Sequence, residues 1–167
     1  AAIVGMVFST ADRQARYVPL GHGAAGGSGD LLADPAATQV PRQPALDRLK
    51  PLLEDEAVRK VGHDLKFDIV VLRAHGIALR GLSFDSMMAS YVLDATRSSH
   101  QIEETSLEHL SYKALTEQDV CGRGAKALPF PRIAPEDALN FAGERADLAL
   151  QLSNQLAPLL VSDQLDD

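Results

Sequence analysis

The stretch most informative about the fold is Lys60-Val61-Gly62-His63-Asp64-Leu65-Lys66-Phe67-Asp68. Its first part completes a short apolar run over 58–62, whose length and composition predict a strand. Apolar residues then recur at helical spacing over 64–75, on one stripe, and Gly76 follows the last of them as a helix-ending residue. The stretch therefore predicts a strand that turns directly into a helix.

The segments on either side continue this alternation of strands and helices. Asp85 is placed to cap a helix, Thr105 with Glu108 forms a capping-box pattern, and Pro135 is typical of a first helical position. The predicted strands are 3–8, 16–20 and 77–84, and the further predicted helices are 45–56, one from Asp85 through Leu93, a short one ending at Tyr112, and 135–160. Strands early and helices later predict an α/β fold with a mixed central β-sheet flanked by helices.

Length and composition predict a single globular domain over 1–167. The chain has 167 residues, 46% of them hydrophobic and 23% charged, which excludes disordered and fibrous proteins. A Gly/Pro-rich segment over 21–44 predicts a long loop. The alternative, a phosphate-binding loop, lacks the Lys-Ser/Thr that should follow the glycines.

The charge and the cysteine content limit the classes of partner. A net charge of −7 argues against binding nucleic acid through a general positive field, but permits a local basic groove or an acidic metal site. The lone cysteine, Cys121, predicts a reducing compartment and a small buried residue rather than a nucleophile. Without a long apolar run, we expect a cytoplasmic protein with no membrane partner.

Two carboxylates of the central helix are candidates for chemistry. Asp64 and Asp68 lie four residues apart and share a helix face, where like charges repel. Asp64 is explained as the helix N-cap. Asp68 is flanked by apolar residues, and a partly buried carboxylate needs a cation, either a metal or an arginine.

The long C-terminal helix offers a second group of polar candidates. Phe141 and Arg145 share one face, whereas Glu144 and Asp147 lie elsewhere on the helix. The simplest interpretation of the two acids is that they belong to the solvated side of an amphipathic helix.

Taken together, these segments resemble a known family. The stretch 60–68 resembles the second motif of the 3′–5′ exonuclease domain of bacterial DNA polymerase I, Asn-x-x-Tyr/Phe-Asp after a strand. The resemblance continues through 76–93 and through Gly122-Arg123-Gly124-Ala125-Lys126, which is similar to the loop before the last motif. The segment 141–147 then lies where the third motif, Tyr-x-x-x-Asp, belongs.

The resemblance implies a ribonuclease H-like fold and two-metal hydrolysis. In the family, four acidic residues hold two Mg²⁺ or Mn²⁺ ions, and a tyrosine hydroxyl helps to position the attacking water. The implied substrate is a single-stranded 3′ end of DNA, removed during proofreading in replication and repair. The implied partner is the polymerase domain of the same parent chain, which the 167 residues do not include.

This sequence departs from the family pattern at four places. Asp68 matches the second-motif aspartate and is the remaining candidate metal ligand, while Asp64 replaces the motif's asparagine. Phe141 replaces the third-motif tyrosine, and Arg145 replaces its aspartate. The first motif, Asp-x-Glu, belongs upstream of Ile3, on a strand that the family fold places centrally, between 3–8 and 58–62. The resemblance thus predicts an additional central strand.

We expect from these departures that Arg145 pairs with Asp68 and lowers its pKa, and that metal binding is weak or absent. Secondary candidates for the site are Asp64, Asp85, Glu144 and Asp147. Phosphate contacts are expected from Lys66, Arg123 and Lys126.

The function implied is a 3′–5′ exonuclease-like domain of a DNA polymerase I with impaired or no nuclease activity. The alternatives are a proofreading exonuclease whose missing acids come from other residues, and a purely structural domain that packs on the polymerase domain. A remoter alternative is an RNase D-like RNA exonuclease, although 76–93 is more similar to the polymerase branch.

Overall fold

The computed structural model describes residues 3–23 and 39–165. Residues 24–38 of the predicted loop lie outside the described residues, and 42–44 belong to the first helix. The strands are β1 (Gly5–Ala11), β2 (Gln14–Pro19), β3 (Lys60–Gly62) and β4 (Leu82–Asp85). The helices are α1 (Arg42–Glu54), α2 (Leu65–Ala74), α3 (Ser86–Leu93), α4 (Ile102–Leu110), α5 (Glu117–Cys121) and α6 (Pro135–Ser162), with short 3₁₀ turns η1 (Gly124–Lys126) and η2 (Phe130–Arg132).

The four strands form two separate two-stranded sheets. β1 pairs antiparallel with β2, and β3 pairs parallel with β4. Pro19 lies opposite Gly5, next to the pair in which Leu20 N donates to the Val4 carbonyl at 2.8 Å. Along two antiparallel strands, hydrogen-bonded residue pairs alternate with pairs that are not hydrogen-bonded. Because Leu20 and Val4 are hydrogen-bonded, the neighbouring pair of Pro19 and Gly5 is not, and Pro19 needs no N–H directed toward β1.

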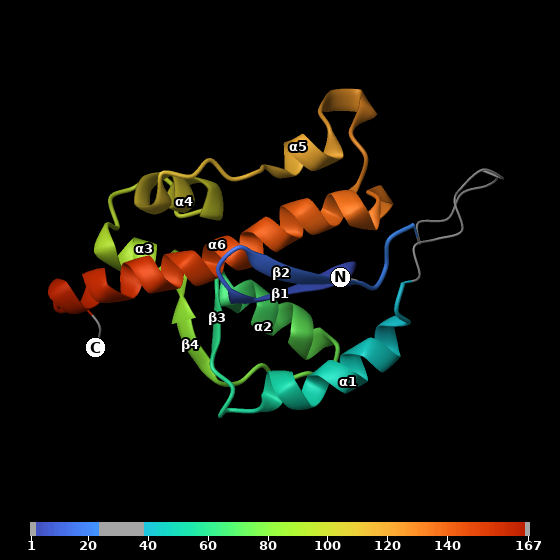
Figure 1. The fold of residues 1–167 in the computed structure, drawn as a ribbon, viewed down its shortest axis with the longest axis horizontal. Coiled ribbons are helices and arrows are strands. Elements are labelled where there is room, and N and C mark those ends of the chain that lie inside the picture. The colour runs from blue at the N-terminus through green and yellow to red at the C-terminus, as the bar shows by residue number, and fades with distance from the viewer. Residues whose placement is uncertain (1–2, 24–38, 166–167) are drawn as a thin grey trace.

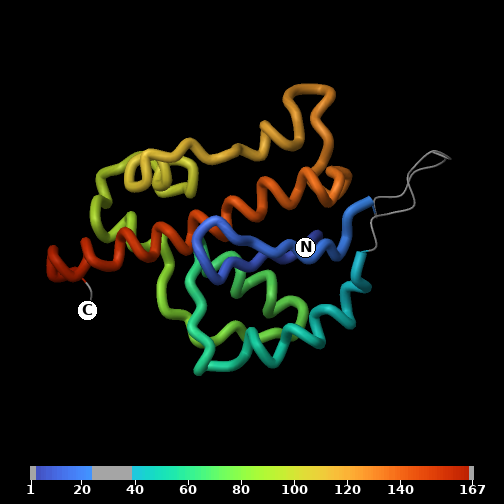
Figure 2. The backbone as a smooth tube through the Cα atoms, in the orientation of Figure 1, coloured from blue at the N-terminus to red at the C-terminus, as the bar shows by residue number. Residues whose placement is uncertain are grey.

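Helix α6 is the central support of the domain. Figure 1 shows it crossing the β1–β2 hairpin, with α4 and α5 on one side and α1 and α2 on the other. The close approach to the hairpin depends on the buried Gly143, where an added Cβ would lie 3.3 Å from the Cβ of Ala15. The backbone trace in Figure 2 shows α3 alongside the C-terminal half of α6.

The apolar core consists of separate clusters, which lie on different sides of α6. One cluster lies under the hairpin and includes Leu46, Leu53 and Ile77. A second cluster joins α3 and α4 to α6, with Ile102 2% exposed and Leu152 0% exposed. Cys121 is buried in a third, small cluster, as predicted, and burial raises the pKa of its thiol. Within the described ranges, no helix is long and apolar enough to cross a membrane.

Helix α4 differs from its prediction at the N-terminus. It begins at Ile102, so Thr105 lies inside the helix with 0% exposure and the predicted Thr105–Glu108 capping box is wrong. The helix starts earlier because the apolar Ile102 packs into the core against α6. A true capping box occurs instead at α5, where Thr116 N and Oγ1 both donate to Asp119 Oδ2 at 2.8 Å.

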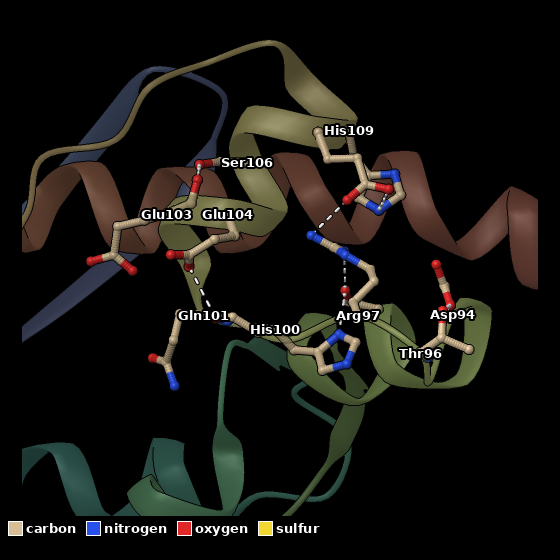
Figure 3. A network of polar contacts seen from close by, with 12 residues as sticks. Asp94, Thr96, Arg97, His100, Gln101, Glu103, Glu104, Ser106 and His109 are labelled. Carbon is tan, nitrogen blue, oxygen red and sulfur yellow. Dashed lines mark hydrogen bonds and ion pairs between the residues drawn. The ribbon is translucent and has the colours of Figure 1, made fainter.

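Two arginines hold α4 against its neighbours. Figure 3 shows Arg97, from the segment between α3 and α4, reaching across the end of α3. Its guanidinium donates to Ser90 Oγ at 2.8 Å and pairs with Glu108 at 2.6 Å. Glu103 points away from this network and takes part in the second contact, with Arg145 of α6.

Candidate active site

A cavity of about 950 Å³ opens between the two sheets, beside α6. Consecutive residues of both strands line it, 7–10 from β1 and 60–62 from β3. Because alternate residues of a strand point to opposite faces of a sheet, consecutive lining residues mean that both strands turn their edges toward the cavity. Asp68, His63 and Arg145 lie on its walls, so the structure brings these three polar residues to one place.

The first turn of α2 brings Asp68 to the cavity. Asp64 adopts the left-handed conformation, with φ 61° and ψ 50°, and its side chain accepts from Phe67 N at 3.4 Å. Few residues other than glycine take this conformation, and aspartate is among the most tolerant of it. The predicted N-cap role of Asp64 is thus confirmed, and Asp68 follows it one turn later.

Asp85 holds the first turns of two helices together. Its carboxylate accepts from Asp64 N at 3.1 Å and Leu65 N at 2.8 Å, at the start of α2. It also accepts from Met87 N at 2.9 Å and Met88 N at 3.4 Å, at the start of α3. The predicted cap of α3 is confirmed. The contacts to the start of α2 are an additional role of Asp85 that the sequence did not predict. This carboxylate is therefore occupied by four backbone donors.

Asp68 lies in unfavourable electrostatic surroundings for a carboxylate. Although part of the residue is exposed to solvent, crowding by protein atoms raises the pKa of its carboxyl to about 6. The negative charges of Asp64 and Asp85 raise this pKa further. The predicted lowering of the Asp68 pKa is wrong, because no cation pairs with it in the described part of the chain.

Arg145 has a different partner from the one predicted. Its guanidinium forms an ion pair with Glu103 of α4 and lies 4.3 Å from the centre of the Phe141 ring. The predicted Arg145–Asp68 pair is wrong. Helix α4 packs on α6 and places Glu103 within ion-pair distance of the arginine. Arg145 Nε is buried and has no hydrogen-bond acceptor among the described residues.

The two other acids of α6 have structural partners. Glu144 accepts from Tyr112 Oη and from Leu115 N, each at 2.7 Å, and so ties the segment after α4 to α6. Asp147 accepts from Arg13 N at 2.5 Å, in the turn between β1 and β2. Neither residue lines the cavity, so neither replaces the third-motif aspartate, and both are less solvated than their amphipathic pattern indicated.

Sequence reasoning did not single out His63, which lines the cavity. Its Nδ1 lies 2.9 Å from Ser86 Oγ, and Ser86 Oγ donates to the Gly62 carbonyl at 3.1 Å. Burial lowers the pKa of the imidazole, and the charge of Arg145 lowers it further, against the opposing effects of Asp85 and Asp64. A histidine followed by an aspartate at the end of a strand, as at His63-Asp64, is too common a pattern to predict this placement.

The three predicted phosphate-binding residues are exposed but do not form one surface. Lys66 lies in the first turn of α2, whereas Arg123 and Lys126 flank or end η1. Figure 1 places the segment after α5 on the other side of α6 from α2. The structure therefore separates Lys66 from the two residues of the glycine loop.

The divalent metal pair implied by the family does not fit the residues present. Asp85 and Asp64 are engaged in capping, and Glu103 is paired with Arg145. Over residues 3–23 and 39–165, no group of three or more His, Cys, Asp or Glu side chains is placed to hold a metal. What remains at the cavity is one free carboxylate, Asp68, together with the cation of Arg145.

Replacing Asp68 with asparagine is expected to stabilise the fold at pH 8. A pKa raised from 3.8 to about 6 means that ionising this carboxyl opposes folding. The unfavourable contribution of ionised Asp68 to the free energy of folding is fully present above about pH 6. It decreases as the pH falls toward 4, where the carboxyl is protonated in the folded protein. Allowing for solvent screening at this partly exposed group, we expect a gain of about 1 kcal/mol at pH 8 and little at pH 4. Urea unfolding of Asp68→Asn and the parent at both pH values measures this. A loss of stability at pH 8 would contradict it.

Comparisons with known proteins agree with this architecture. The family model described as "DNA polymerase I, ribonuclease H-like domain" matches residues 34–141, more than half of the chain. The DNA polymerase I of Pseudomonas aeruginosa is 40% identical over 158 residues, covering 93% of this chain and 16% of that protein. That of Rhizobium leguminosarum is 38% identical over 172 residues, covering 97% of this chain and 17% of that protein.

A solved structure has a similar fold at low sequence identity. It is the POL domain of Pol1 from M. smegmatis, in a complex with a DNA primer-template and dNTP, with a TM-score of 0.66 and 20% identity. The match covers 97% of this chain and 22% of that one. The chain thus spans about one sixth of the length of the curated relatives.

Proposed function

Because the chain belongs to the family of the ribonuclease H-like domain of DNA polymerase I, we propose that it is the 3′–5′ exonuclease-like domain of such a polymerase, with its hydrolytic site inactive. The observation that carries the proposal is the placement of Arg145, which lines the same cavity as Asp68. Its guanidinium is fixed there by Glu103 and by the face of Phe141.

The charge of Arg145 opposes two-metal hydrolysis directly. Two unit charges a few Å apart interact by roughly several kcal/mol at the dielectric of a protein surface. The Glu103 carboxylate offsets part of this charge, but the guanidinium still lines the cavity that Asp68 shares and offers no oxygen ligand to a divalent cation. Phe141, at the family's tyrosine position, also lacks the hydroxyl that would orient a water.

The proposed role is then that of a structural domain within a replication and repair polymerase of the cytoplasm. It would pack against the polymerase domain of the same chain rather than remove mispaired 3′ nucleotides. The test is whether the full-length protein shortens a labelled 3′ end in a manner that depends on Asp68. We expect that it does not.

The open strand edges support a further part of the proposal, an additional strand between β1 and β3. Just before β1, the Val4 carbonyl accepts from Leu20 N, directly after β2. Backbone groups of successive residues point to opposite edges of a strand, so Val7 directs its groups away from β2. Lys60 N donates to the Gly81 carbonyl at 2.8 Å, toward β4, so Val61 directs its groups away from β4. Two strands with unpaired edges facing one cavity are an aggregation hazard unless a strand fills the space.

We predict that the amides of Val7 and Val61 are protected from hydrogen exchange in a full-length polymerase that carries this domain. A strand pairing with both edges would slow their exchange by 10-fold or more relative to the 167-residue chain. The Lys60 amide, already bonded to Gly81, is the control and should change little. A stable, monodisperse 167-residue chain with β1 and β3 paired directly would contradict the proposal.

Any contact with single-stranded DNA should depend on a few exposed cations, because the net charge is −7. We propose that Arg123 and Lys126 bind phosphates near η1, and that Lys66 does so separately on α2. Arg123→Ala with Lys126→Ala is then expected to weaken binding several-fold at low salt and to reduce its salt dependence. Unchanged affinity of the double variant for a labelled oligonucleotide would refute this assignment.

A further inference from the structure

His22, shortly after β2, is held by hydrogen bonds to its ring and to its backbone. The residue is 4% exposed, and its Nδ1–H donates to the Ile133 carbonyl at 2.8 Å, since a carbonyl can only accept. Nε2 is then an acceptor, and the Tyr17 hydroxyl of β2 donates to it at 2.5 Å. The backbone N and O of His22 bond to the Gln39 side chain at 2.8 and 2.7 Å. Three segments of the chain therefore fix this residue.

The His22 ring is neutral at pH 7. Burial lowers the pKa of the imidazole, against the opposing effects of the Ile133 carbonyl and the negative charge of Glu136. A neutral imidazole has one donor and one acceptor nitrogen, and both are satisfied here. Turning the ring would break both bonds in a buried place, so His22 offers its neighbours a rigid contact.

Two phenylalanine rings connect His22 to the guanidinium of Arg145. The imidazole contacts Phe130 of η2 with ring centres 5.8 Å apart, and Phe130 contacts Phe141 of α6 at the same separation. The interplanar angles of 53° and 54° describe tilted rings, an arrangement in which aromatic groups attract each other. Phe141 in turn lies 4.3 Å from Cζ of Arg145. We call this series of contacts the aromatic path; it leads from the buried imidazole to the cavity.

The contact with the Phe141 ring is what limits the orientation of Arg145. The other contact of the guanidinium is the ion pair with Glu103, whose two side chains are 29% and 25% exposed. An ion pair that solvent reaches constrains a long side chain weakly. Phe141 is itself half-buried, and Phe130 packs against its ring and limits the directions that it takes.

We propose that Phe130 and His22 are positioning residues that hold the Arg145 guanidinium in the cavity through the ring of Phe141. The inference rests on the proposed function, because it explains how the guanidinium that opposes metal binding is kept in place. Breaking the aromatic path at Phe130 would let the Phe141 ring turn and free the guanidinium for part of the time, leaving it only the ion pair with Glu103.

Modification of arginine by phenylglyoxal in the full-length protein, followed by peptide mapping, tests the proposal. The reagent attacks an accessible guanidinium, so the rate at Arg145 measures how firmly that side chain is held. Phe130→Leu removes the ring but keeps an apolar side chain, and should raise this rate about 5-fold, a factor typical of one cation–π contact. Tyr17→Phe removes the hydroxyl that donates to His22 and should raise it about 2-fold.

Three controls accompany these variants. Phe130→Tyr keeps a ring at the same place and should leave the rate unchanged. Tyr112→Phe removes a hydroxyl that bonds to α6 at Glu144, outside the aromatic path, and should also have no effect. Arg97, whose side chain is 14% exposed and paired with Glu108, shows within each protein whether the whole domain has loosened.

The double variant separates a shared path from two independent effects. Tyr17→Phe should add nothing when Phe130 is already leucine, whereas independent structural roles predict that the two rate factors multiply. Equal rates at Arg145 in the parent and in Phe130→Leu would overturn the proposal, and so would multiplying factors or an equal rise at Arg97. Nuclease activity of the parent, measured separately, tests the inactive site independently of how Arg145 is held.

Discussion

Replacing Asp85 with alanine is expected to lower the free energy of unfolding by about 3–4 kcal/mol, because it removes one N-cap and two further charge-assisted acceptors. Its carboxylate accepts from four backbone amides, two at the start of α2 and two at the start of α3. Three of the four contacts are part-buried, so these amides lose their acceptor away from bulk water. The loss also frees the turn at Asp64, whose left-handed backbone (φ 61°) those contacts hold.

Urea unfolding of the parent and of Asp85→Ala, at one pH, measures this loss. Asp85→Asn keeps Oδ1, which accepts three of the four amides, and should cost less than half as much. Asp119→Ala is the control, since it removes a capping carboxylate from a single short, exposed helix and should have a much smaller effect. Equal losses for Asp85→Ala and Asp119→Ala would show that Asp85 does not join the two helices.

Short-range patterns in the sequence predicted much of the site's framework. The strand at 58–62, the helix after it and the caps Asp64 and Asp85 all follow from the spacing of nearby residues, and the structure confirms them. The long helix from Pro135 is confirmed for the same reason. Such features are predictable because they depend on hydrogen bonds between residues close in sequence and on which face of a helix or strand is apolar.

Features that depend on which elements pack together were not predictable. Arg145 pairs with Glu103, 42 positions away, because α4 docks on α6 through Ile102. The Thr105–Glu108 pattern looked like a helix start only because nothing in the local sequence shows that Ile102 is buried. The contacts from Asp85 to α2 likewise require the parallel pairing of β3 with β4, which no local pattern specifies.

The second large effect concerns catalysis. A two-metal centre supplies several kcal/mol of transition-state stabilisation, and each 1.36 kcal/mol corresponds to a tenfold change in rate, so its loss reduces cleavage by about 10³-fold or more. Among the described residues that line the cavity, Asp68 is the one carboxylate, and the Arg145 guanidinium stands in place of a further acid. We therefore expect no cleavage that depends on Asp68, with Mg²⁺ or with Mn²⁺.

Arg145→Asp provides the matched comparison, because it restores an acid at the family's third-motif position. In the full-length protein, with the upstream strand present, this variant is expected to gain binding of Mn²⁺ in a calorimetric titration. Slow nuclease activity should accompany that gain, limited by the missing hydroxyl at Phe141. Failure of the variant to bind Mn²⁺ more tightly than the parent would count against the role given to Arg145.

The most direct test is single-turnover cleavage of a single-stranded oligonucleotide labelled at its 5′ end, so that shortening from the 3′ end is seen as a ladder. The parent, Asp68→Ala and Arg145→Asp are compared in full-length protein with excess enzyme and Mn²⁺. An inactive site predicts that the parent and Asp68→Ala are indistinguishable, both at background. Robust metal-dependent shortening by the parent that Asp68→Ala abolishes would contradict it.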